Sequence, residues 1–215
     1  MDLTELSRRP SSEEINAMPL RHYEGPVEVV RTAEGWARAE ADMRRDGVLG
    51  FDTETRPTFR KGKLNAPSLI QIATAGTVYL IQLAWLPFGE DCAALLASPD
   101  IVKAGVSIGD DMRALARLHP FTPAGLVDLG QVARAHRLPN QGLRTLAASL
   151  FGWRISKGSQ CSNWSLMDLS PRQIEYAATD AWIGRCIYLR LRELGLADGS
   201  ASEMAATRKR RGSGA

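Results

Sequence analysis

The sequence predicts an α/β domain in which helices flank a mixed sheet. Segments 68–73 and 77–83 are rich in β-formers and lie close together, which is typical of an antiparallel hairpin. Segments 90–96, 101–106 and 110–118 then read as helix, buried strand and helix. Strands followed by such an alternation predict a sheet that is antiparallel in its first strands and parallel afterwards.

Composition indicates one globular domain with ragged ends. Of the 215 residues, 44% are hydrophobic and 24% are charged, which are the proportions of an ordinary soluble protein. We expect no membrane partner, because no apolar run approaches the roughly 20 residues of a membrane span and the polar, acidic amino terminus differs from a secretory signal. The cysteines are odd in number and lack metal-binding spacing, which favours a reducing, cytoplasmic location. They are Cys92, Cys161 and Cys186.

The formal net charge of +3 comes from the end of the chain. Segment 208–211 carries four positive charges, so the remainder has a formal charge of about −1. Any affinity for nucleic acid must therefore come from local patches, the tail or bound metal, and not from a field over the whole surface.

We expect the chain to have three parts. Residues 1–25 form a loosely attached arm, with a short helix capped near Ser11. Residues 26–196 form the domain, which should be helical from Asp128 onward. Residues 197–215 are small and basic and are expected to form a disordered tail.

The most informative stretch is residues 48–54, an apolar strand that ends in Asp52 and Glu54. Alternation along a strand points both carboxylates in the same direction. Charge at the end of a sheet must be solvated, paired or neutralised by cations, and hard ions such as Mg²⁺ or Mn²⁺ suit carboxylate oxygens. On its own, such a pair is more often a strand that runs into a solvated polar turn.

A second acidic point follows the buried strand, at Gly109-Asp110-Asp111. Gly109 suggests a tight turn, and Asp110 is placed to cap the next helix through its side-chain oxygen. Asp111 would then occupy the first helical turn with its carboxylate free.

A third acidic point lies on a helix with a strong start at Ser170-Pro171-Arg172-Gln173, a pattern typical of a capping box with proline in the first position. Tyr176 and Asp180 are four residues apart, so they lie one turn apart on one face. Alanines at positions 177, 178 and 181 would let this helix approach the sheet closely. A tyrosine–aspartate pair is more often structural than catalytic, so its weight depends on the other acids.

A run of four cations directly follows the acidic strand. Such runs are usually solvated, but beside a site that acts on a polyanion this one is well placed to hold phosphates. Phe59 and Trp164 are candidates to stack on terminal bases, although core packing is an equally good interpretation for Trp164. The cations are Arg56, Arg60, Lys61 and Lys63.

Together these residues resemble the DEDDy-type 3′–5′ exonucleases, the family of ribonuclease D and the Werner syndrome exonuclease domain. Residues 51–54 resemble the first motif, 104–115 (AGVSIGDDMRAL) the second and 176–181 (YAATDA) the third. Segment 157–164 (KGSQCSNW) is similar to the segment before the last motif. The resemblance extends over essentially the whole domain and implies a ribonuclease H-like fold.

The resemblance implies that four carboxylates hold two divalent cations, Mg²⁺ or Mn²⁺, with a tyrosine beside the attacking water. These residues are Asp52, Glu54, Asp111, Asp180 and Tyr176. Two ions about 3.5–4 Å apart can activate water and stabilise the departing oxygen. The implied activity is hydrolysis of phosphodiester bonds from a free 3′ end of nucleic acid, with DNA and RNA both left open. The substrate-binding residues that we predict are Thr53, Arg56, Arg60, Lys61, Lys63 and Trp164.

Two other interpretations stay open at this point. An aspartyl-phosphate phosphatase would use Asp52 as its nucleophile with a lysine partner such as Lys103, but it gives no role to Tyr176 and Asp180. A nucleic-acid-binding module could keep the fold and lose turnover, although all five positions carry the residue types that catalysis needs.

Overall fold

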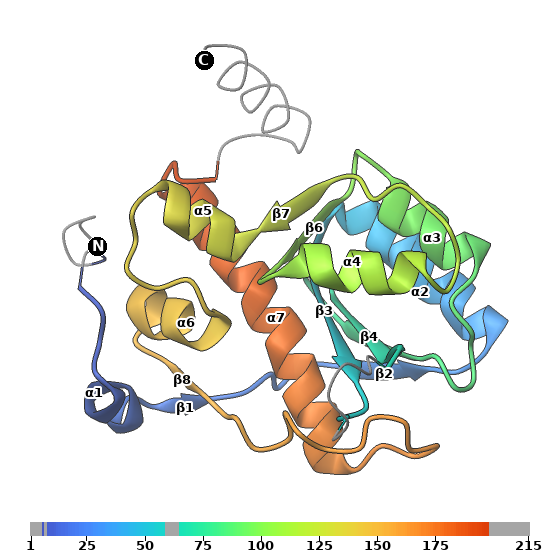
Figure 1. Cartoon of the computed structure of the whole chain (residues 1–215), viewed down its shortest axis with the longest axis horizontal. Coiled ribbons are helices and arrows are strands. Elements are labelled where there is room, and N and C mark those ends of the chain that lie inside the picture. Colours follow the sequence, from blue (N-terminus) through green and yellow to red (C-terminus); the bar gives the residue numbers. More distant parts are fainter. Residues whose placement is uncertain (1–5, 7, 59–64, 198–215) are drawn as a thin grey trace.

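The computed structural model describes residues 6, 8–58 and 65–197, which form three layers (Figure 1). A six-stranded sheet with the order β2-β5-β4-β3-β6-β7 lies between two groups of helices. Its strands are β2 (Val27–Val30), β3 (Val48–Thr55), β4 (Pro67–Ala73), β5 (Val78–Gln82), β6 (Val102–Gly105) and β7 (Leu126–Asp128). The helices of the layers are α2 (Ala33–Asp46), α3 (Glu90–Ala97), α4 (Ile108–Ala116), α5 (Leu129–Ala135), α6 (Leu143–Phe151) and α7 (Pro171–Glu193).

The predicted mixed sheet is confirmed. Strand β4 runs antiparallel to both of its neighbours, β3 and β5, and every other pairing in this sheet is parallel. The predicted hairpin is therefore the β4–β5 pair. The strong helix start is also confirmed, because Ser170 and Gln173 form a capping box at the beginning of α7.

Alternation along β3 assigns its side chains to the two faces of the sheet. Helices α2, α3 and α4 cover one face, and Leu49 and Phe51 are buried in the core on that side. Helices α5, α6 and α7 cover the other face (Figure 1). Gly50 contacts α7, and by the period of two Asp52 and Glu54 face the same way. The acids thus project from the strand toward α7.

Helix α7 packs on β3 at backbone distance. A Cβ atom built on Gly50 would lie 2.0 Å from the carbonyl oxygen of Ala181. The alanines at positions 177, 178 and 181 are fully buried in this contact region. The expected close approach of helix and sheet is therefore present, and it requires glycine on the strand.

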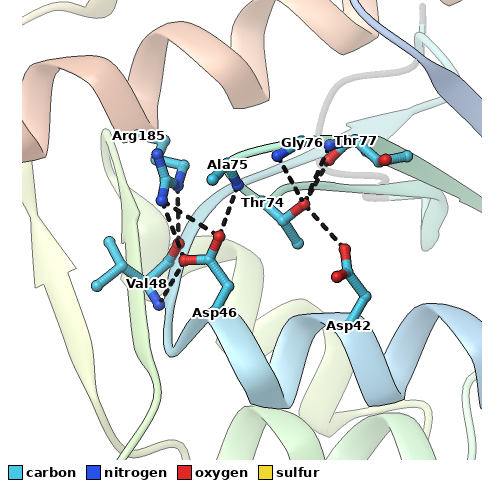
Figure 2. Close-up of polar contacts among 8 residues, drawn as sticks. All are labelled: Asp42, Asp46, Val48, Thr74, Ala75, Gly76, Thr77 and Arg185. Atoms are coloured by element: carbon cyan, nitrogen blue, oxygen red, sulfur yellow. Dashed lines mark hydrogen bonds and ion pairs between the residues drawn. The ribbon is translucent and has the colours of Figure 1, made fainter.

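A partly buried ion pair attaches α7 to the beginning of β3 (Figure 2). Arg185 Nη2 lies 3.0 Å from Asp46 Oδ1, and Arg185 Nε donates to the carbonyl oxygen of Val48 at 2.9 Å. Asp46 Oδ2 also accepts a hydrogen bond of 2.6 Å from the amide of Ala75 in the β4–β5 turn. One carboxylate thus joins the end of α2, the β4–β5 turn and α7.

The described residues of the predicted amino-terminal arm make backbone contacts with the domain. The short helix α1 (Ser12–Ala17) is capped by Ser11 as predicted, and after it β1 (Leu20–Arg21) pairs in parallel with β8 (Arg154–Ile155). The amide of Tyr23 then donates to Thr179 Oγ1 on α7 at 3.1 Å. These contacts are made by backbone groups of the arm. The polar character of its side chains therefore does not predict them.

Two further sequence expectations concern the carboxyl-terminal half. The chain beyond Asp128 is not entirely helical, since β8 interrupts it after α6. The predicted tail, residues 197–215, lies outside the described residues except for Ala197, which is buried. Within the described ranges, no helix is both long and apolar enough to cross a membrane.

Replacing Gly50 with alanine should destabilise the protein. The new methyl group would meet the backbone of α7, and overpacking of this kind costs about 1–3 kcal/mol. Denaturant unfolding of Gly50→Ala measures the change. Gly76→Ala is the matched control because nothing lies within 4 Å of a Cβ at that position. Equal unfolding midpoints for both variants and the wild type would contradict the close contact.

Candidate active site

Three of the predicted acids and the predicted tyrosine line one cavity of about 400 Å³. Asp52 and Glu54 come from the end of β3, and Tyr176 and Asp180 come from the first half of α7. Pairing between β3 and β6 stops at Gly50, so the acidic end of β3 extends beyond its neighbour on that side. The structure therefore brings these four side chains together.

The pKa of each of the four carboxyl groups is raised above its ordinary value. Burial raises the pKa of Asp52 well above its ordinary value, and repulsion from Asp180, Asp111 and Glu54 adds to that effect. Burial, followed by repulsion from Asp180 and Asp111, raises the pKa of Glu54 to about 8. Burial also raises the pKa of Asp111 and of Asp180 to about 6. Carboxyl groups perturbed in this way are typical of functional sites.

Asp111 lies beside the cavity and is held by a neighbour from β3. It lies in the first turn of α4. The N-cap of this helix, Ser107, has a left-handed backbone conformation with φ of 60°. Thr53 Oγ1 donates to Asp111 Oδ1, so the expectation of a free carboxylate is wrong. The amide of Thr53 donates to Asp52 Oδ1 at 2.9 Å. Thr53, predicted to bind substrate, thus contacts two acids.

Asp110 does not cap α4. The helix begins at Ile108 with Ser107 as its N-cap, and no side chain makes a capping bond there. Asp110 instead lies within the first turn, is exposed and pairs with Arg113 one turn later. The predicted cap fails because the helix starts two residues earlier than the sequence pattern suggests.

Trp164 cannot serve as an exposed base-stacking platform in this structure. Its side chain is 1% exposed, and its ring lies 5.9 Å from that of Tyr176. It supports the tyrosine from the core, which corrects the predicted substrate contact. Of the predicted cation run, Arg56 is exposed, and its carbonyl oxygen accepts a bond from Asn65. Phe59, Arg60, Lys61 and Lys63 lie outside the described residues.

Arg144, which the sequence pattern did not single out, also lines the cavity. Its Nη2 donates to the Tyr176 hydroxyl oxygen at 3.3 Å, and its guanidinium lies 5.9 Å from the centre of the tyrosine ring. Lys157 and Gln160 of the segment before α7 line the same cavity. The only sequence signal for Arg144 is a basic residue beside the apolar stripe of α6, and surface helices commonly have such residues.

Lys103 makes its hydrogen bond outside the cavity that contains the acids. Its side chain is fully buried, its Nζ donates to the carbonyl oxygen of Ser98 at 2.7 Å, and burial lowers its pKa to about 7. Lys103 pairs with Leu49 near the beginning of β3, whereas Asp52 lies toward the other end. The partner proposed for an aspartyl-phosphate phosphatase is thus absent from the cavity.

The donor chemistry of the cavity fits a hard divalent cation. All four predicted ligands offer carboxylate oxygens. Asp180 is 6% exposed, and its Oδ1 atom has no hydrogen-bond partner among the described residues. The side chains do not form a complete coordination shell by themselves. Among residues 6, 8–58 and 65–197, no three His, Cys, Asp or Glu side chains are grouped closely enough to share an ion.

A family model described as 3′–5′ exonuclease matches residues 27–195. The chain belongs to the 3′–5′ exonuclease family. The match spans β2 to α7 and includes every residue of the candidate site. The ribonuclease H-like fold of this exonuclease family agrees with the mixed sheet and its two helical layers.

Named relatives support this membership. The mouse bifunctional 3′–5′ exonuclease/ATP-dependent helicase WRN is 33% identical over 69% of this chain and 11% of its own length. The human exonuclease mut-7 homolog is 30% identical over 79% of this chain and 23% of its own length. Ribonuclease D of Gluconacetobacter diazotrophicus is 31% identical over 85% of this chain and 47% of its own length. The chain thus spans less than half of each of these exonuclease relatives.

Solved exonuclease structures share the fold. The exonuclease domain of Aedes aegypti Nibbler has a TM-score of 0.72 and 25% identity, with 89% of this chain and 99% of that chain covered. Ribonuclease D of Trypanosoma brucei, solved with RNA U12, has a TM-score of 0.66 and 23% identity, with 79% and 62% covered. Such low identity in the second case shows the fold alone.

In the absence of divalent cations, stability should fall as pH rises. The ordinary pKa of the Glu54 carboxyl is 4.5 and its folded value is about 8, so its stabilising contribution is complete below about 4.5 and is lost as pH rises through about 8. Glu54→Gln cannot titrate there, so this variant should melt above the wild type at pH 8.5 but not at pH 5, measured in chelator. Asp110→Asn, which changes an exposed acid, is the control. If the melting temperature of Glu54→Gln falls with pH as steeply as that of the wild type, the assignment is contradicted.

Proposed function

We propose that this chain is a metal-dependent 3′–5′ exonuclease that hydrolyses the terminal phosphodiester bond of a nucleic acid with a free 3′ end. The main support is the meeting of Asp52, Glu54, Asp180 and Tyr176 in one cavity, with Asp111 beside it, in a chain of this family. Repulsion among buried acids is a cost that a structural role does not explain, because uncharged side chains would fill the same space without it.

The reaction replaces one bond to phosphorus by another. The oxygen of water bonds to the phosphorus of the terminal nucleotide, and the bond from that phosphorus to the 3′ oxygen of the preceding nucleotide breaks. The departing oxygen takes a proton, and a nucleoside 5′-monophosphate leaves. Divalent cations, when bound, would lower the pKa of the attacking water and stabilise the charge on the departing oxygen.

The side chains of this chain have distinct roles in the proposal. Asp52, Glu54, Asp111 and Asp180 would hold the cations, as enzymes of this family generally use divalent ions. Burial raises the pKa of the Tyr176 hydroxyl, so it stays protonated at neutral pH. The hydroxyl can therefore hold the attacking water by a hydrogen bond and set its direction, but it cannot act as a base. Trp164 packs beside the ring and limits its movement.

Contacts beyond the cleaved bond form the second part of the proposal. The run of Arg56, Arg60, Lys61 and Lys63 directly follows β3 in the sequence, and these cations would bind substrate phosphates by charge-assisted hydrogen bonds. The nearby Thr53 acts differently, because its hydroxyl is already bonded to Asp111. It would position a metal ligand instead of contacting the substrate through that group.

Purified protein should release mononucleotides in steps from the 3′ end of a strand labelled at its 5′ end, in the presence of Mg²⁺ or Mn²⁺. Chelator should stop the reaction because, without cations, the clustered carboxylates repel the phosphate and nothing replaces the cations' stabilisation of the departing oxygen. Matched single-stranded and recessed DNA and RNA substrates, resolved on denaturing gels, test this and show which nucleic acid is preferred. A circular single strand is the control and should resist cleavage. Binding of these strands without any release would instead support the non-catalytic binding module.

Replacing the neighbouring residues Asp110 and Asp111 one at a time should have different effects on activity. Asp111→Asn should lower kcat/KM by more than about 100-fold, since even groups that only orient metal ligands are worth 10–100-fold. Asp110→Asn should retain activity and change stability by no more than about 0.5 kcal/mol, because Asp110 is exposed. Turnover and melting of both variants check this. An inactive Asp110→Asn beside an active Asp111→Asn would reverse the assignment.

A further inference from the structure

Arg144 is a cation placed among the acids of the cavity without a charged partner. It belongs to the first turn of α6, and residues 142–145 of that turn line the same cavity as Asp52, Glu54 and Asp180. Burial raises the pKa of Glu54 and of Asp180, and the positive charge of the Arg144 guanidinium partly offsets that rise. Even so, no ion pair joins it to a carboxylate within the described part of the chain.

The hydrogen-bonding groups of Arg144 exceed the acceptors that surround it. A guanidinium has five N–H donors, and within the described ranges its side chain makes one hydrogen bond, from Nη2 to Tyr176 Oη at 3.3 Å. The Nε atom is buried and has no hydrogen-bond partner in the part of the chain that the structure describes. Buried donors are nearly always satisfied, and an unsatisfied one in a native protein needs an explanation. A ligand with several acceptor oxygens would supply it.

The beginning of α6 has the same chemical preference. Its N-cap, Gly142, makes no side-chain capping bond, and the amide groups in the first turn of a helix favour anions. Lys157 and Gln160 add a further cation and a further donor to the lining of the cavity. One cavity therefore contains carboxylates suited to cations and a second set of groups suited to an anion.

We propose that Arg144, with the first turn of α6, binds the non-bridging oxygens of the phosphodiester bond that is cut. This inference rests on the proposed function and extends it to how the substrate is held. A planar guanidinium can give two parallel hydrogen bonds to phosphate oxygens, and Arg144 retains donors for this while bonded to Tyr176. The same side chain would then couple the position of the phosphate to that of the tyrosine that directs the water.

The competing role for Arg144 is to position Tyr176 only. Arg144→Gln separates the two roles because an amide can still donate to the tyrosine hydroxyl but carries no charge. Arg144→Lys keeps the charge but loses the planar pair of donors. The matched control is Arg134→Gln on α5, where the guanidinium bonds to Gln141 outside this cavity.

Steady-state release of mononucleotides from a labelled strand gives the first measurement. Arg144→Gln should lower kcat/KM by roughly 10²–10³-fold, as the loss of one preorganised donor to a developing charge does, with partial recovery in Arg144→Lys. Arg134→Gln should match the wild type. Full activity in Arg144→Gln with an unchanged melting temperature would overturn the phosphate assignment and leave the tyrosine contact as the role of Arg144.

Binding of small molecules gives a measurement that does not depend on turnover. With Mg²⁺ present, the wild type should bind adenosine 5′-monophosphate more tightly than adenosine by calorimetry, and Arg144→Gln should lose this preference while its affinity for adenosine stays the same. An equal preference in both proteins would refute the inference even if the chain is an active exonuclease. If Arg144→Gln loses the preference but the wild type releases no mononucleotides, the proposed function is refuted and the phosphate site is retained.

Discussion

The packing of α7 against β3 is the contact on which the candidate site depends. Asp52 and Glu54 lie on the strand, Tyr176 and Asp180 lie on the helix, and their spacing follows from how close the two elements come. The absence of a side chain at Gly50 allows the backbone of the helix to touch the strand. An α-helix advances 1.5 Å and turns about 100° for each residue, so a shift of one residue in this contact would turn Asp180 out of the cavity.

The Arg185–Asp46 pair restrains the same helix at a second point. The side chains of Arg185 and Asp46 are 16% and 10% exposed. The carboxylate also accepts hydrogen bonds from the backbone amides of Val48 and Ala75. Breaking a partly buried pair of this kind leaves an unpaired charge that is largely removed from water, which is costly. Two points of attachment fix both the position and the rotation of α7. The fold thereby withstands the repulsion among the acids, which on its own would push the helix away from the strand.

Features of the site that are local in sequence could be predicted, and features that depend on which elements meet could not. The period of two along β3 places Asp52 and Glu54 together, and the pattern at Ser170 marks where α7 begins. The burial of Trp164, the bond from Thr53 to Asp111 and the docking of the arm against β8 require tertiary contacts between distant segments. Asp110 shows a boundary error, because the chain enters α4 two residues early through the left-handed Ser107.

Placement of Arg144 illustrates why an acidic site must also contain positive groups. The chain apart from segment 208–211 carries a formal charge of about −1, so its overall field does not attract a polyanion. Charges separated by more than about 8 Å are largely screened at physiological ionic strength, whereas Arg144 lies close enough to Glu54 and Asp180 to act on the pKa of both. Arg144 and Lys157 share the cavity with the acids, so they can favour the phosphate where the carboxylates oppose it. The sign of the charge at each wall, and not the net charge of the domain, then determines where a strand can bind.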